Sequence, residues 1–235
     1  MSNESGPEAV SPPTDKRFNS ADADLLMSVL RHRRDIRGNR FLPDPIRDAE
    51  IDQLIDAALY SPSVGFSQPW EFLVIRDAQV KLKVQSVFRQ ENTRAAGQFR
   101  DHKRADYRNL KLEGITEAPV NLAVFYRPSE GPVLGQTSMA EMGLYSVVCA
   151  VQNIWLMARA MNIGIGWVSI LDPAKVKEIL GVPEDRRLVA YLCVGRVSEF
   201  PPTPELEALA WERRKARSSL VYRDGFANSY YPDET

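Results

Sequence analysis

The apolar positions of this chain follow two different spacings, and their alternation predicts a mixture of helices and strands. Apolar residues at helical spacing predict helices over roughly Asp22–Arg34, from near the capping residue Asp48 to just before Ser61, and after the capping residue Asp77. Strands are predicted at Glu71–Ile75, Val120–Tyr126, within Gly164–Ile170 and at Val189–Gly195, and a short helix is predicted between Asp172 and Gly181. This order lacks the regular rhythm of a doubly wound sheet, so an α+β fold with three layers is expected.

The stretch Leu144–Met161 stands out because it is apolar nearly throughout. It contains Gln152, Asn153 and Arg159, and no basic flank precedes it, so it is predicted to be a buried helix and not a membrane span. A helix that is apolar on nearly every side needs more cover than one domain usually supplies. A subunit interface is therefore the expected place for this helix.

Polar and charged stretches divide the rest of the chain into a tail, a domain and a C-terminal arm. Residues 1–20 contain many Gly, Pro, Ser and Asn residues and predict a disordered tail without the apolar core of a signal peptide. Residues 21–235 are expected to form one domain. Within it, the charged region at about 89–114 is interpreted either as a solvated helical face or as a mobile lid over a site. Prolines after residue 200 lead into a charged C-terminal arm at about 200–235.

Composition narrows the possible partners. The chain has 235 residues, of which 44% are hydrophobic, and a net charge of -1, so neither nucleic acid nor an anionic membrane is expected as a partner. Cys149 and Cys193 lie in apolar runs and are predicted to be buried free thiols, as in a reducing, cytoplasmic compartment. With only His32 and His102 and no CxxC or HExxH motif, no metal site is expected.

The run Arg33-Arg34-Asp35-Ile36-Arg37 ends the first predicted helix. Guanidinium groups bind planar oxyanions through paired hydrogen bonds, so the cluster suits a phosphate group. Basic residues also favour helix C-termini because they oppose the macrodipole, and this structural explanation stays open.

Two loops rich in small residues add candidate binding groups. Ser63, Gly65 and Gln68 lie between a predicted helix and a predicted strand, where Gly65 permits close approach of another group and Gln68 can both donate and accept. Gly166 and Ser169 lie in a similar glycine-containing segment. Each loop alone is also consistent with an ordinary connector.

Taken together, these segments resemble the nitroreductase superfamily of flavin-binding proteins, from about Leu25 to Phe226. The arginine run, the Pro-Ser-x-Gly-x-x-Gln-Pro-Trp loop, the apolar helix and the Gly-x-Gly strand appear in the family order. Typical members have serine at the position of Asp35 and commonly asparagine at that of Phe66. Those two residues, the Gly-Trp-Val-Ser sequence ending at Ser169 and the stretch Tyr107–Ile115 are similar instead to members that fragment reduced FMN.

The resemblance implies a nitroreductase-like, FMN-binding, homodimeric α+β sandwich. It implies that reduced FMN is a substrate, that O2 is the co-substrate, and that no metal takes part. The implied products are 5,6-dimethylbenzimidazole, the lower ligand of vitamin B12, and erythrose 4-phosphate. A separate NAD(P)H-dependent flavin reductase is the expected source of reduced FMN.

The resemblance also implies roles for particular residues. Arginines of the run and Arg214 are expected to bind the phosphate, Asp35 and Ser169 to transfer protons, and Tyr107 to belong to the lid. The full set expected at the FMN is Arg33, Arg34, Asp35, Ile36, Arg37, Ser63, Gly65, Gln68, Leu112, Gly166, Ser169 and Arg214. The structural alternatives are an ion pair for Asp35 and a buried, backbone-bonded hydroxyl for Ser169.

Two departures from the pattern and two other functions stay open. The chain is one residue longer near Gly38, and Gly143 stands where an aspartate is expected. One alternative function is an NAD(P)H-dependent nitroreductase or flavin reductase that recycles its FMN. The other is a non-catalytic flavin-binding protein.

Overall fold

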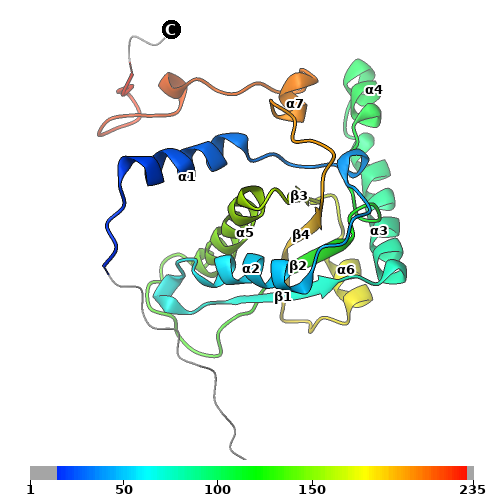
Figure 1. Ribbon diagram of the computed structural model, residues 1–235, viewed down its shortest axis with the longest axis horizontal. Helices are drawn as coiled ribbons and strands as arrows, with labels where there is room; N and C mark the ends of the chain where they lie inside the picture. Colours follow the sequence, from blue (N-terminus) through cyan, green and yellow to red (C-terminus); the bar gives the residue numbers. More distant parts are fainter. Residues whose placement is uncertain (1–14, 232–235) are drawn as a thin grey trace, which may run out of the picture.

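The computed structural model describes residues 15–231 (Figure 1). Most of the predicted tail, residues 1–14, lies outside the described residues. The helices are α1 (Ser20–His32), α2 (Asp48–Leu59), α3 (Ala78–Ala96), α4 (Asp101–Asn109), α5 (Met142–Ala160), α6 (Pro173–Leu180) and α7 (Glu205–Ala208). The strands are β1 (Trp70–Ile75), β2 (Val120–Tyr126), β3 (Gly164–Trp167) and β4 (Arg187–Gly195), and short 3-10 turns lie at Gly38–Arg40, Val64–Phe66 and Arg217–Ser219.

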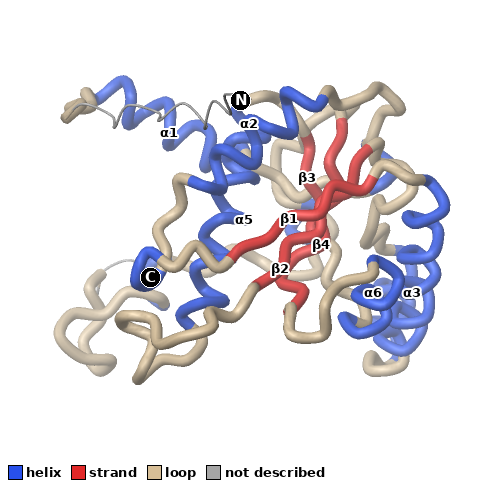
Figure 2. The backbone as a smooth tube through the Cα atoms, turned by 90° about the horizontal axis from the view of Figure 1, so that it is seen from below, coloured by secondary structure: helices blue, strands red, loops and turns tan. Residues whose placement is uncertain are grey.

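The four strands form one antiparallel sheet in the order β1-β2-β4-β3. All four predicted strands are confirmed, although β1 and β4 begin one and two residues earlier than expected. Helices cover both faces of this sheet, with α5 on one side and α3 and α6 on the other (Figure 2). The predicted three-layer α+β arrangement is therefore present.

Side chains that alternate between the two faces of β2 explain why helices pack on both faces of the sheet. Leu122 and Val124 point into the core shared with α2 and α5, whereas Ala123 and Phe125 point into the core shared with α3 and α6. Every one of these side chains is at most 3% exposed. A strand buried on both faces has a continuous apolar sequence, which is why the apolar run alone predicts β2.

Local capping residues set several helix ends. Asp77 caps α3 by accepting a hydrogen bond from the Val80 N–H at 2.9 Å. Asp172 caps α6, which Gly181 ends with a φ of 64°, and both features agree with the sequence. Asp48, however, is not a cap as predicted: it is the first helical residue.

The outer face of α5 remains exposed in the single chain. Val147, Ala150 and Ile154 are buried against the sheet, but Tyr145 is 51% and Val148 42% exposed. Cys149 lies on this exposed face, so the prediction of a buried thiol is wrong for one protomer, while buried Cys193 agrees with it. The physical reason is that the sheet and α2 cover only part of the helix circumference.

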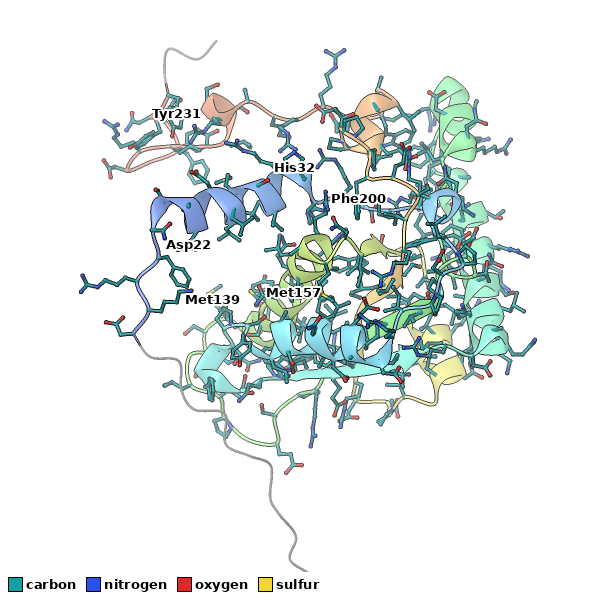
Figure 3. All side chains as sticks on the ribbon, viewed as in Figure 1. Asp22, His32, Met139, Met157, Phe200 and Tyr231 are labelled. Atoms are coloured by element: carbon teal, nitrogen blue, oxygen red, sulfur yellow. The ribbon has the colours of Figure 1, made fainter. Side chains whose placement is uncertain are left out.

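Helix α1 packs loosely on the rest of the chain. None of its residues is buried, and Leu25 and Leu26 are 68% and 55% exposed. A groove of about 730 Å³ lies between α1 and α5, and Met157 lines it (Figure 3). No helix within the described residues is long and apolar enough to cross a bilayer.

Glu50 joins α2 to the end of β4. Its buried carboxylate accepts hydrogen bonds from Arg196 at 2.6 Å and from the Arg47 side chain at 3.3 Å. The bond from Arg47, supported by Arg196, lowers the pKa of Glu50 from 4.5 to about 2.

This pKa predicts an acid-sensitive contribution to stability. Since the folded pKa lies below the unfolded one, the stabilisation is complete above pH 4.5 and is lost as the pH falls toward about 2. We expect Glu50→Gln to flatten the fall of the urea midpoint across that range. Glu130→Gln, at an exposed loop position, is the matched control and should keep the wild-type slope. A wild-type slope in Glu50→Gln would contradict the assignment.

Candidate active site

The arginine run docks along the free edge of β3. The Ile36 N–H donates to the Ile165 carbonyl at 2.9 Å, and the Trp167 N–H donates to Asp35 Oδ1 at 3.0 Å. A Cβ at Gly166 would fall 2.1 Å from the Ile36 carbonyl oxygen. Only glycine therefore permits this approach, and Gly166 acts by letting the run lie flat on the strand.

The Arg34 guanidinium donates its hydrogen bonds to backbone carbonyls. It donates to Arg31 at 2.7 Å, to Pro201 at 3.0 Å and also to Pro202. Beside it, Arg159 donates to the His32 carbonyl at 2.9 Å and stacks on Phe200 at 3.9 Å, and both of these partners are labelled in Figure 3. Arg34 thereby fastens the chain after β4 to the end of α1.

Arg37 and Asp35 form an ion pair, and Arg37 also donates to the Leu112 carbonyl at 3.1 Å. The structural alternative for Asp35 is thus realised, and it does not exclude proton transfer. Burial raises the pKa of the Asp35 carboxyl, against the opposing effects of Arg37 and the Trp167 N–H. A carboxyl so placed takes up a proton more readily than a solvated one.

Arg33 differs from the other two arginines of the run. Among the described residues, its guanidinium has no hydrogen-bond or ion-pair partner, and its Cζ lies 4.6 Å from the centre of the Trp155 ring. Burial lowers the pKa of Arg33, Asp35 raises it, and the charges of Arg34 and Arg214 lower it further. Arg214 of the C-terminal arm therefore lies close enough to add its charge to the cluster.

A pocket of about 150 Å³ opens at this cluster. Its lining combines the arginine run with residues after α4 and residues of the C-terminal arm: Arg33, Arg34, Asp35, Arg37, Leu110, Lys111, Pro204, Glu205, Leu206 and Leu209. Segments far apart in sequence thus enclose one cationic pocket, at the end of α5 nearest α7.

The predicted lid region forms the end of α3 and all of α4. Tyr107 is buried, donates to Asn92 Oδ1 at 2.7 Å and stacks on Phe99 with 4.9 Å between ring centres. Trp211 of the C-terminal arm packs edge-on against Phe99 at 5.4 Å. The region is therefore not a fully solvated helix, because the C-terminal arm packs against it. Its motion as a lid stays a prediction.

The loop after α2 is conformationally strained. Gly65, Phe66 and Gln68 have φ values of 55°, 53° and 46°, and the latter two are unusual for side chains that bear a Cβ. Ser63 Oγ accepts from the Gln68 N–H at 3.1 Å, and Ser67 Oγ is buried without a partner among the described residues. Such strain is typical of binding loops.

The structure does not bring this loop into the arginine pocket of the same protomer. The loop touches α5 through a hydrogen bond from the Val64 N–H to Ser146 Oγ at 3.1 Å, whereas the arginine run touches Trp155. Ser146 and Trp155 are nine positions apart in α5, or about 13 Å along the helix axis. Ser63, Gly65 and Gln68 therefore lie at the opposite end of α5.

Ser169 follows β3 and is exposed. Its hydroxyl has no hydrogen-bond partner among residues 15–231, so the alternative of a buried, backbone-bonded hydroxyl is wrong. A free hydroxyl two residues beyond Trp167 remains available to a bound molecule.

The structure describes the surroundings of both expected departures from the family pattern. Gly38 begins a 3-10 turn, and its N–H donates to the Glu113 carbonyl at 2.9 Å. At Gly143 a Cβ would fall 2.5 Å from the Tyr126 ring. That ring occupies the space in which an aspartate side chain would lie.

Sequence reasoning assigned no role to Trp155, Trp211 or Ser146. Trp155, like Arg159, interrupts the aliphatic pattern of α5. The sequence shows this interruption but does not show what Trp155 contacts. The contacts of the other two depend on tertiary packing. Within the described residues, no group of three or more His, Cys, Asp and Glu side chains could hold a metal ion.

Comparisons with known proteins agree with this fold. The sequence profile described as the Nitroreductase family matches residues 30–196, which covers more than half of the chain. The chain belongs to the nitroreductase family.

Curated relatives and a solved structure narrow the comparison. The chain is 41% identical over 200 residues to a 5,6-dimethylbenzimidazole synthase of Rhodospirillum rubrum, covering 84% of this chain and 94% of the relative. It is 39% identical to one of Rhodobacter capsulatus, covering 83% and 94%. An iodotyrosine deiodinase structure bound to FMN and 3-iodo-L-tyrosine superposes with a TM-score of 0.67 at 20% identity, covering 85% of this chain and 98% of that one.

Proposed function

We propose that this protein binds reduced FMN and, with O2, fragments it to 5,6-dimethylbenzimidazole and erythrose 4-phosphate. The observation that carries the proposal is its identity of 41% with a 5,6-dimethylbenzimidazole synthase over 94% of that relative's length. Asp35, which replaces the serine typical of other family members, points to the same branch of the family.

The donor set fits the phosphate end of FMN. The Arg33 N–H groups have no hydrogen-bond partner among the described residues, and Arg34 and Arg37 add positive charge to the pocket lining. The charge of Arg214 also acts on Arg33. A guanidinium with unengaged N–H groups suits the oxygens of a phosphate monoester. Arg34 contributes charge and shape, since carbonyls already take up much of its hydrogen-bonding capacity.

The strained loop fits the ring end. The Gly65 backbone, the Gln68 amide and the unpartnered Ser67 hydroxyl provide polar groups for the edge of a heteroaromatic ring. In this proposal Ile36 and Gly166 shape the floor beneath the arginine run, and Leu112 closes its side.

A bound reduced flavin supplies the electrons with which O2 reacts, and this chemistry requires no metal. The protein's own residues hold the substrate, exclude water and handle protons. Asp35 accepts and releases a proton at its carboxyl group, and the Arg37 guanidinium and the Trp167 N–H fix the orientation of that group. Ser169 offers its hydroxyl as a second proton carrier, and the lid around Tyr107 excludes bulk water.

The proposal includes a homodimer. Exposed apolar side chains lie on α5, at Tyr145 and Val148, and on α1, at Leu25 and Leu26. Leu156 and Met157 line the groove between the two helices. The two proposed halves of the flavin site lie about 13 Å apart along α5. A two-fold dimer through α5 would cover these apolar side chains and place the loop of one protomer near the arginine run of its partner.

Two other functions are compatible with a flavin site. A reductase would recycle its flavin with NAD(P)H, and a non-catalytic protein would only store it. In the proposed reaction NAD(P)H acts elsewhere, on a separate flavin reductase that supplies reduced FMN. Stoichiometry separates the three functions.

We expect one flavin to disappear for each turnover. The protein is mixed anaerobically with chemically reduced FMN, exposed to air, and analysed by mass spectrometry for dimethylbenzimidazole and by absorbance for flavin. Omitting the protein controls for spontaneous oxidation. Quantitative return of oxidised FMN would support storage. In a separate incubation with NAD(P)H, steady NAD(P)H oxidation with flavin absorbance preserved would support the reductase.

Ser169→Ala tests the proton-carrier role. The hydroxyl is exposed and unpartnered, so its loss should leave the thermal midpoint unchanged. If Ser169 carries a proton, dimethylbenzimidazole formed per O2 consumed should fall at least about tenfold, and the missing O2 should appear as hydrogen peroxide. The matched control is Ser86→Ala, which removes an exposed hydroxyl on α3, outside the proposed site. An unchanged product ratio in Ser169→Ala would remove Ser169 from the mechanism.

The dimer is tested at Val148, on the exposed face of α5. Wild type should scatter light with twice the 26.5 kDa mass of one chain, and Val148→Asp should shift toward 26.5 kDa because it places a charge in the interface. Leu82→Asp is the control, since Leu82 is similarly exposed (47%) but lies on α3. A monomeric wild type would refute the dimer.

A further inference from the structure

Trp155 makes two separate contacts with the arginine run. Its ring lies beneath the Arg33 guanidinium at 4.6 Å, and its indole N–H donates to the Arg34 carbonyl at 3.2 Å. One side chain on a rigid helix thereby contacts both the cationic group of Arg33 and the backbone of the next residue.

The contact with Arg33 matters because the three arginines of the run are bound differently. Arg34 is committed to carbonyls of Arg31, Pro201 and Pro202. Arg37 is paired with Asp35 and donates to a carbonyl of the lid. Arg33 alone of the three has no polar partner within residues 15–231, so the Trp155 ring is what restrains its guanidinium.

An indole face restrains a guanidinium without using its hydrogen bonds. The attraction is electrostatic and acts through the plane of the ring, so the N–H groups at the guanidinium edge stay directed outward. A carboxylate partner in the same place would occupy those N–H groups and neutralise the charge. The Trp155 ring does neither.

We propose that Trp155 is a positioning residue that holds Arg33 ready for the phosphate and so lets the site distinguish FMN from riboflavin. The inference rests on the proposed FMN site. It assigns to Trp155 no contact with the flavin and predicts an effect only on the part of the affinity that the phosphate supplies.

The decisive quantity is the ratio of dissociation constants for riboflavin and FMN. Both oxidised flavins are titrated by equilibrium dialysis into wild type, Trp155→Leu and Trp155→Phe. We expect the ratio to fall about threefold to tenfold in Trp155→Leu, the range of a partly desolvated cation–π contact. In Trp155→Phe, which keeps an aromatic face, most of the ratio should be retained.

A double-mutant cycle shows whether Trp155 acts through Arg33. In the Arg33→Ala background, Trp155→Leu should not lower the ratio further, because the group it positions is gone. Trp167→Leu is the matched control, since its ring lies in the same cluster, 6.2 Å from that of Trp155. Any packing loss there should weaken both flavins equally.

The outcomes separate this inference from the proposed function. A wild-type ratio well above one, unchanged in Trp155→Leu, would overturn the positioning role and leave the FMN site intact. An equal loss of both affinities in Trp155→Leu would show packing alone and would also overturn the role. A wild-type ratio near one would overturn the phosphate site itself, and the inference with it. If Trp155→Leu fails to fold, a ratio in Trp155→Phe equal to that of Arg33→Ala would overturn the inference.

Discussion

The docking of the arginine run on the edge of β3 is the constraint on which the candidate site depends. Gly166 permits the approach, and two backbone N–H groups, those of Ile36 and Trp167, fix its register. The run pairs with β3 through a single parallel bridge, Asp35 with Ile165, and its extended backbone sends successive side chains to alternate sides. Ile36 is buried, while Asp35 and Arg37 meet beside the pocket. A side chain at position 166 would displace all of these groups together.

The sequence predicted most helices and strands well because nearby apolar and capping residues determine where these elements begin and end. The run Val120–Tyr126 forms β2 without a shift, and Asp172 with Gly181 delimits α6 as expected. Local patterns predicted the burial of a side chain less well where that burial depends on segments packed from elsewhere. Cys149 lies in an apolar stretch yet is exposed, because no other segment within residues 15–231 of the chain covers that side of α5.

The sequence predicted which residues belong to the candidate site but not which task each of them performs. Three arginines in five residues look alike in sequence, yet their surroundings differ. Arg34 meets carbonyls brought by a segment some 167 positions away, Arg37 meets a lid carbonyl, and Arg33 meets an indole. These partners come from distant parts of the chain, so no spacing rule could have assigned them. The family resemblance supplied the list of residues, and only the packing separates their tasks.

The bonds from Arg34 to the Pro201 and Pro202 carbonyls also bear on the order in which the protein is made. Residues 201 and 202 are made after all four strands of the sheet, the last of which ends at Gly195. Until then Arg34 lacks two of its acceptors, and the pocket lacks the wall formed by Pro204 and Leu206. The nascent chain therefore contains every strand of its sheet before it contains the residues that complete its cationic pocket.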